Sequence, residues 1–256
     1  MFSIKNLVVE FDDNTAVNNV SFDINEGEIV AIVGESGSGK SVTALTIAGL
    51  LNNEARVTLG SVLYNDKDLL KLSKKEMRSL QGDEISMIFQ EPMSSLNPTM
   101  KIGKQMAEML KLHREYDKVQ VKELVCKALE STGLSRDNYD KYPHQLSGGM
   151  RQRVMIAMAM LCEPKLLIAD EPTTALDVTV QEQIIKLLQD INEKNKTSIL
   201  FITHNLNLAR RLSDKLIVMS KGCIVESGNA KEIFENPKEE YTKKLIEAIP
   251  KRPELK

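Results

Sequence analysis

The sequence predicts an α/β fold, and three observations lead to this prediction. Short apolar runs rich in Val and Ile alternate with stretches of helical periodicity along most of the chain. A glycine-rich loop with the pattern Gly-x4-Gly-Lys-Ser separates one apolar run from the helical stretch that follows it, at residues 34–41. From position 90 to position 164 only helical patterns remain, which indicates a helical insertion into a strand–helix core.

The expected strands are short, rich in β-branched residues and bounded by turn residues. They are residues 4–9, 20–24, 29–33, 85–89, 166–169, 198–203, 215–219 and 224–226. The run 29–33 is apolar throughout and ends in glycine, which is typical of a buried strand that leads into a loop. The expected helices are residues 41–51, 102–114, 118–132 and 149–162, with a helical tail from Ala230 that breaks at Pro237 and ends at Pro250.

Composition excludes several classes of protein. The formal net charge of −2 gives no basic excess, so we expect no nucleic-acid partner. The first residues lack the pattern of a signal peptide, and the longest apolar run, residues 154–162, is far shorter than the roughly 20 residues of a membrane-spanning helix. The 3 cysteines lie far apart without C-x-x-C spacing, which argues against disulfides, a zinc site and an iron–sulfur cluster.

The glycine-rich loop has the sequence and the context of a phosphate-binding loop, because it follows an expected strand and opens an expected helix. Its glycines let backbone amides turn toward phosphate oxygens, and the helix N-terminus adds positive potential. We expect Lys40 to bind the β and γ phosphates of a nucleoside triphosphate and the Ser41 hydroxyl to bind Mg²⁺. The expected ATP-binding residues here are Gly34, Glu35, Ser36, Gly37, Ser38, Gly39, Lys40, Ser41 and Val42.

A pair of adjacent carboxylates ends the apolar run that begins at residue 166. Adjacent side chains at the end of a strand point to different sides, so Asp170 and Glu171 can carry different tasks. We expect Asp170 to hold the Mg²⁺ shell and Glu171 to act as the general base that polarises the attacking water.

A second glycine-containing loop, Leu-Ser-Gly-Gly-Met-Arg-Gln-Arg at residues 146–153, opens another apolar helix. This stretch resembles the signature motif of ABC (ATP-binding cassette) ATPases, which other P-loop families lack. The resemblance implies that the loop contacts the γ phosphate held by an opposite subunit, so that two nucleotides lie between two cassettes. The residues expected in this role are Leu146, Ser147, Gly148, Gly149 and Gln152.

The same resemblance implies functions at further positions. Gln90 matches the Gln-loop residue that contacts Mg²⁺ and water, and His204 matches the switch histidine that contacts the γ phosphate. With Lys40 and Glu171 they form the expected catalytic set. Phe11 resembles the aromatic residue that stacks on adenine, with Val17 beside the base, and a core or edge role for Phe11 stays open. The segment resembling the D-loop at the dimer interface is Ala175, Leu176 and Asp177.

ABC ATPases combine a RecA-like P-loop NTPase core with an antiparallel β subdomain and an inserted α-helical subdomain. Transferred to this chain, the resemblance implies a core with its β subdomain over residues 1–92 and 158–230. The helical subdomain that carries the signature spans residues 93–157, and a helical tail spans residues 231–256.

Residues 88–98, 150–160 and 169–181 resemble the peptide/nickel importer subfamily. This implies uptake of oligopeptides or dipeptides, driven by ATP through two transmembrane permease subunits and supplied by an extracellular or periplasmic solute-binding protein. The second ATPase subunit is expected to be a paralogue, and the chain is expected at the cytoplasmic face of the cell membrane. Residues 91–100 are the expected contact with a permease subunit.

Three departures from the subfamily keep a nickel or metal-chelate importer open. Asn205 follows the switch histidine where many peptide importers have Asp. The tail at residues 236–249 lacks the usual His-Pro pair, and the sequence stops at Lys256 without a cysteine-bearing extension.

Functions outside transport are less compatible with the sequence. A soluble ABC ATPase of DNA maintenance would carry a zinc module or a coiled coil inside the cassette, but Gln90 and Ser147 lie only 57 positions apart. A translation-type ABC protein would need two P-loops in one chain. A P-loop kinase or GTPase would lack the Leu-Ser-Gly-Gly stretch, and the Asn-Lys-x-Asp guanine motif is missing.

Overall fold

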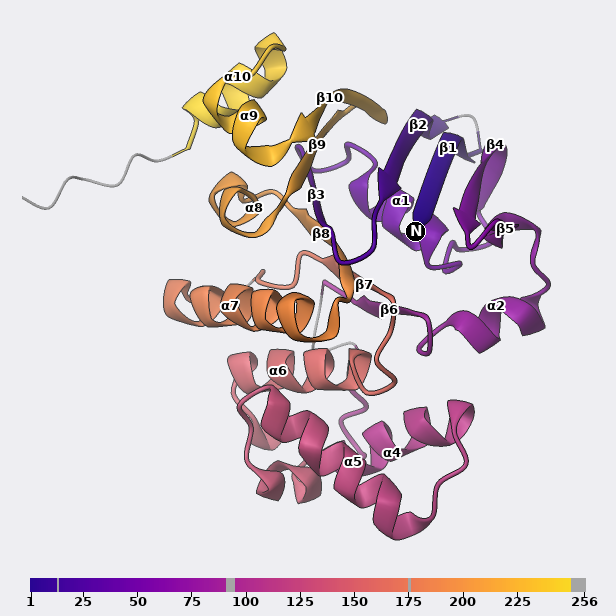
Figure 1. Ribbon diagram of the computed structural model, residues 1–256, viewed down its shortest axis with the longest axis vertical. Helices are drawn as coiled ribbons and strands as arrows, with labels where there is room; N and C mark the ends of the chain where they lie inside the picture. The colour runs from indigo at the N-terminus through magenta and orange to yellow at the C-terminus, as the bar shows by residue number, and fades with distance from the viewer. Residues whose placement is uncertain (13, 91–94, 175, 250–256) are drawn as a thin grey trace, which may run out of the picture. The chain divides into compact units, whose positions relative to one another are not determined.

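The computed structural model describes residues 1–12, 14–90, 95–174 and 176–249, and the chain divides into two units (Figure 1). The first unit consists of Met1–Lys71 and Leu200–Lys256, and the second of Leu72–Ile199. The strand β8 (Ser198–Thr203), which is buried along its whole length, crosses this division in the sequence.

A four-stranded antiparallel sheet in the first unit has the order β2-β1-β4-β5. Its strands are β1 (Phe2–Phe11), β2 (Asn14–Ile24), β4 (Ala55–Tyr64) and β5 (Lys67–Asp68). The buried residues of β1 change phase between Ile4 and Leu7, where the pairing register with β2 shifts. Asn6 has a left-handed φ of 49° at this bulge and donates to the Asn19 side chain over 2.9 Å. The bulge therefore keeps both halves of the strand facing one core.

The first unit also holds three strands of a second sheet. β3 (Ile29–Val33) pairs in parallel with β9 (Lys215–Ser220), which pairs antiparallel with β10 (Cys223–Asn229). All five residues of β3 are buried, as expected for a parallel strand covered on both faces. The helices of this unit are α1 (Lys40–Ile47), α8 (Leu206–Leu212), α9 (Ala230–Glu235), α10 (Glu240–Glu247) and the 3-10 helix η1 (Leu69–Lys71).

The second unit contains two parallel strands, β6 (Ile85–Ile88) and β7 (Leu166–Asp170), and most of the helices. The α-helices are α2 (Lys74–Leu80), α4 (Ile102–His113), α5 (Lys118–Ser131), α6 (Gly148–Ala159) and α7 (Val178–Asn195). Two 3-10 helices, η2 (Arg136–Asp140) and η3 (Pro143–Gln145), precede α6. α6 packs against α4, α5 and β6, so the signature segment opens the central helix of this unit.

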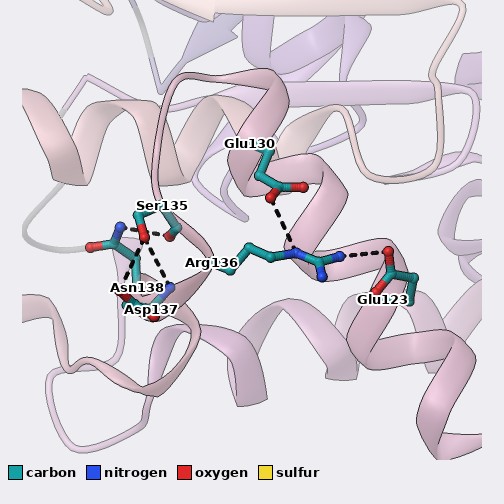
Figure 2. A network of polar contacts seen from close by, with 6 residues as sticks. All are labelled: Glu123, Glu130, Ser135, Arg136, Asp137 and Asn138. Atoms are coloured by element: carbon teal, nitrogen blue, oxygen red, sulfur yellow. Dashed lines mark hydrogen bonds and ion pairs between the residues drawn. The ribbon is translucent and has the colours of Figure 1, made fainter.

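A polar network ties η2 to α5 at the surface of the second unit (Figure 2). The Arg136 guanidinium contacts Glu123 at 2.5 Å and Glu130 at 3.2 Å, and these side chains are close to half exposed. Ser135 begins η2 by accepting from the Asp137 amide. Exposed ion pairs contribute little to stability, so this network mainly fixes where η2 lies on α5.

The predicted α/β fold is confirmed: every strand expected from the sequence is present, most of them longer than expected. Between positions 95 and 164 the described chain contains no strand, as predicted. β4, α2, α7 and α8 were not predicted. The domain boundaries expected from the sequence stay a prediction. None of the helices in the described ranges is long and apolar enough to cross a membrane.

Candidate functional site

The phosphate-binding loop connects β3 to α1 in a backbone conformation that requires glycine at two positions. Gly34 has φ of 152°, and a Cβ there would collide with the carbonyl oxygen of Met219. Gly39, the N-cap of α1, has φ of 97°, and a Cβ there would lie 2.5 Å from the carbonyl oxygen of Ala16. Glycine is therefore required at both positions, because φ is positive and because there is no room for a Cβ atom.

Lys40 is held inside this loop, although it is a charged residue with only 5% of its surface exposed. Its Nζ donates to the carbonyl oxygens of Gly34 at 2.9 Å and Glu35 at 2.8 Å. The ammonium therefore lies at the centre of the turn that the motif forms. The carbonyl dipoles of the loop thus satisfy this buried ammonium group in place of water.

The turn between β9 and β10 supports the phosphate-binding loop. Gly222 donates from its amide to the Ser38 carbonyl oxygen at 3.2 Å and accepts from the Asn18 amide at 2.8 Å. A Cβ on Gly222 would lie 3.0 Å from the Ala16 carbonyl oxygen. The backbone of β2, the loop and this turn therefore meet at close range, and the sequence motif did not indicate this support.

The two residues predicted beside adenine differ in exposure. Phe11 is half-buried at the end of β1, where it pairs with Asn14 of β2 and Ala55 of β4. Val17 is 0% exposed and pairs with Val9 inside the sheet. Phe11 thus offers ring surface to a ligand, whereas Val17 packs in the core, and its predicted contact with the base stays a prediction.

His204 lies exposed at the end of β8, directly before α8. The next residue holds the turn: the Asn205 side chain accepts from the amides of Asn207 at 3.0 Å and Leu208 at 3.4 Å. Its own amide donates to the Thr203 hydroxyl at 3.0 Å. The turn that presents the imidazole is therefore fixed on both sides of His204.

Asp170 and Glu171, the carboxylate pair at the end of β7, differ in burial and in backbone conformation. Asp170 is 5% exposed at the end of β7, and Glu171 has a left-handed φ of 45°. Glu171 Oε2 accepts from the Thr174 hydroxyl at 2.9 Å and from Gln90 Nε2 at 3.4 Å. The structure thus brings two predicted catalytic residues together and adds Thr174, which the sequence reasoning missed.

The signature segment is built by close packing of α6 on α7. Ser147 caps α6 by accepting from the Met150 amide at 3.3 Å. A Cβ on Gly149 would lie 2.7 Å from Cγ1 of Val180, closer than Cβ contacts occur in proteins. Leu146 is 4% exposed and Gln152 is 1% exposed, so both side chains are buried in the second unit.

The segment that resembles the D-loop leads into α7. Asp177 caps that helix by accepting from the Val180 amide at 3.0 Å. Gln181 donates to the carbonyl oxygens of Thr173 and Leu176, both at 3.1 Å, and so fixes the turn after β7. Ala175 lies outside the described residues, as do residues 91–94 of the expected permease contact.

Comparison with known proteins places this chain in a family. The ABC transporter family model matches residues 17–174. The dipeptide transport ATP-binding protein DppD of Bacillus subtilis is 47% identical over 98% of this chain and 77% of its own length. The chain belongs to the ABC transporter family. The oligopeptide transport ATP-binding protein OppD of Escherichia coli is 46% identical over 98% of this chain and 76% of its own length.

Solved ABC cassettes share the fold. An ATP-binding cassette solved as a dimer with ADP and Pi has a TM-score of 0.80 and 29% identity, covering 90% of this chain and 99% of its own. The cbiO1 protein of Clostridium perfringens, part of an ABC transporter complex, has a TM-score of 0.80 and 28% identity, covering 92% of this chain and 90% of its own. This ABC protein is therefore an ATPase with a P-loop NTPase core.

The residues present fit a Mg²⁺ ion of the kind that accompanies ATP. Magnesium takes one or two carboxylates together with phosphate oxygens and water, so a cage of several acidic residues is not required. The described residues hold no cluster of three or more His, Cys, Asp or Glu. Asp170 is a buried carboxylate at the end of β7, a donor type that suits Mg²⁺. The Ser41 hydroxyl is half-buried in the first turn of α1.

Proposed function

We propose that this ABC ATPase is the ATP-hydrolysing subunit of an importer for dipeptides or oligopeptides. The observation that carries the proposal is near full-length identity of 46–47% to proteins named for dipeptide and oligopeptide transport. Those names favour peptides over the nickel or metal-chelate alternative. They also favour transport over a soluble ABC ATPase without a transport function.

In this proposal the loop at residues 34–41 binds the triphosphate. Lys40 leaves the carbonyl oxygens of Gly34 and Glu35 for the β and γ phosphates, and the amides of the loop and of the first turn of α1 bind phosphate oxygens. Phe11 stacks on the adenine ring. Binding at this loop comes before any chemistry, because the positioned phosphates define the line of attack of water.

In this proposal hydrolysis depends on residues of both units. Glu171 polarises the attacking water, and Thr174 and Gln90 orient its carboxylate. His204 contacts the γ phosphate. Mg²⁺, held by Ser41, Gln90 and Asp170, would neutralise developing charge on the phosphates. Each step thus requires a side chain whose position the local structure fixes.

The assembly we propose contains two ATPase subunits, the second being a paralogue, and two transmembrane permease subunits. The signature residues 146–149 and 152 contact the nucleotide of the opposite subunit, and residues 175–177 lie at the interface between the two. Residues 91–100 contact a permease subunit at the cytoplasmic face of the membrane. A solute-binding protein outside the membrane delivers the peptide.

The test of this function uses Glu171→Gln in the complex with its permease subunits. We expect loss of peptide uptake and of phosphate release, with ATP retained, because the amide keeps the shape of the side chain without its basicity. Loss of a general base costs about 10²–10⁴-fold in rate. The matched control is Glu193→Gln, an exposed position on α7, which should leave both rates unchanged.

Two results would reject the proposal. Phosphate release at the normal rate by Glu171→Gln would remove Glu171 from its role as base. ATP-dependent uptake of nickel and not of peptides by the unmodified complex would reject the substrate class.

A further inference from the structure

The C-terminal part of the first unit reaches back to the phosphate-binding loop. The Tyr241 hydroxyl, on the first turn of α10, accepts a hydrogen bond from the Glu35 amide at 3.4 Å, and the two residues are separated by 206 positions in the sequence. Glu35 is the second residue of the Gly-x4-Gly-Lys-Ser motif. A helix far along the chain therefore contacts the backbone of the loop itself.

A carboxylate of β10 fixes the start of α10. Glu226 accepts from the amides of Lys238 at 2.9 Å and Glu239 at 3.2 Å, immediately before the helix begins. Burial raises the pKa of Glu226, but hydrogen bonds from the Lys238 amide, the Thr242 hydroxyl and the Glu239 amide, together with the positive charge of Lys238, hold the pKa below its ordinary value. Thr242, next to Tyr241, is only 1% exposed. Tyr241 therefore lies on a helix whose first residues are held by hydrogen bonds to β10.

Both peptide groups that flank the Glu35 Cα are consequently held. The Glu35 amide, in the peptide that joins it to Gly34, donates to Tyr241. The Glu35 carbonyl oxygen, in the peptide that joins it to Ser36, accepts from Lys40 Nζ at 2.8 Å and from the Ser38 amide at 3.2 Å. The orientation of these two peptides sets where the next amides of the loop point. A loop restrained before the ligand arrives loses less conformational entropy on binding, which strengthens the affinity.

We propose that Tyr241 is a positioning residue for nucleotide binding, and that α10, anchored by Glu226, holds the phosphate-binding loop in the conformation that accepts ATP. The inference rests on the proposed binding of ATP at residues 34–41. The hydroxyl acts through the Glu35 amide and touches no reacting atom. Its effect is therefore on affinity for ATP and not on the rate of the chemical step.

The test compares Tyr241→Phe with the unmodified full-length chain, because phenylalanine keeps the ring and removes only the hydroxyl. We expect the Kd for MgATP, measured by titration of the purified chain, to rise about three- to tenfold, as expected for one hydrogen bond. In the complex with its permease subunits, KM for ATP should rise by the same factor while kcat stays within about twofold. Glu226→Gln should raise Kd in the same direction by a smaller factor.

Two controls separate the possible failures. Tyr116→Phe, at a tyrosine that is 41% exposed in the other unit, should bind MgATP like the unmodified chain. Lys40→Ala should lose MgATP binding; normal binding by this variant would reject the proposed ATP site itself. If Lys40→Ala fails to bind but Tyr241→Phe binds normally or more tightly, the positioning role alone is wrong. A fall in thermal stability and kcat with Kd unchanged would likewise reject it, because that pattern describes a purely structural contact.

Discussion

Substitution of Gly149 by alanine tests whether this signature glycine serves the packing of α6 on α7 or the nucleotide. The added Cβ would lie 2.7 Å from Cγ1 of Val180, so one of the two helices must shift. Overpacking of this kind costs about 1–3 kcal/mol. Alanine in place of glycine within a helix returns at most about 1 kcal/mol of propensity. The clash therefore wins, and we expect Gly149→Ala to lose about 1–2 kcal/mol of unfolding free energy.

Removing the opposing methyl groups should release the strain. Val180→Ala alone loses a partly exposed contact, which costs about 1 kcal/mol or less. In the double variant the methyl group that alanine adds at position 149 has room. We therefore expect the loss of unfolding free energy in the double variant to be smaller, by about 1–2 kcal/mol, than the sum of the losses in the two single variants. Thermal unfolding of the four proteins measures this coupling, since 1 kcal/mol moves Tm by about 2–4 °C for a chain of this size.

The ATPase rate of the same four proteins then separates the two roles. If Gly149 serves packing alone, the double variant should regain both stability and the hydrolysis rate of the permease complex. If the missing Cβ is also needed for a phosphate of the opposite subunit, stability should return while hydrolysis stays low. Strict additivity in Tm would refute the reasoning, because it would show that the Cβ of residue 149 and the Val180 side chain do not meet.

Two further predictions follow from the anchors of the site loops. Glu226→Gln should lower Tm at neutral pH by an amount equivalent to about 1 kcal/mol, since the carboxylate accepts two backbone amides. The pKa of Glu226 is lower in the folded protein than its ordinary value of 4.5. The stabilisation by its carboxylate is therefore complete above pH 4.5 and is lost as the pH falls through the pKa of the folded protein. The Tm difference between the unmodified protein and Glu226→Gln should shrink over that acidic range. Asn205→Asp should leave Tm and ATPase rate nearly unchanged, because both side chains cap α8 with an oxygen, whereas Asn205→Ala should cost about 1 kcal/mol. A Tm difference that grows toward acid, or an aspartate variant as unstable as the alanine variant, would contradict these assignments.

The sequence predicted the strands that are apolar throughout and the loops whose chemistry has a fixed spacing. β3 and β8 are buried along their whole length, so their sequences carry an unbroken apolar signal. β4 was missed because its exposed residues outnumber its buried ones and Gly60 interrupts it. α7 was missed although it is long, because it opens with the β-branched residues Val178, Thr179 and Val180, which favour strands over helices.

The site shows a similar division between motif residues and their supports. The residues of the phosphate-binding loop are local in the sequence, so their spacing alone identified them. Gly222 and Tyr241 support that loop through contacts with residues far along the chain, and such contacts leave no local pattern. Thr174 supports Glu171 through a side-chain hydrogen bond within one turn, which the motif does not indicate. The resemblance placed Val17 beside the base, and the structure buries this side chain completely, a property that the motif does not indicate.

Four helices, α1, α6, α7 and α8, each begin directly after one of the predicted site loops. The N-cap residues of these helices indicate which helix N-terminus is suited to hold phosphate. Ser147, Asp177 and Asn205 each accept a backbone amide from the helix that they begin, so part of the donor capacity of α6, α7 and α8 is satisfied within the chain. α1 begins instead at Gly39, which has no side chain to accept from the first turn. The amides at a helix N-terminus need acceptors from a cap, from water or from a ligand. Because the Gly39 cap supplies no side-chain acceptor, the phosphates of the proposed ATP can accept from the first turn of α1, whereas each of the three polar caps fixes the start of its own helix.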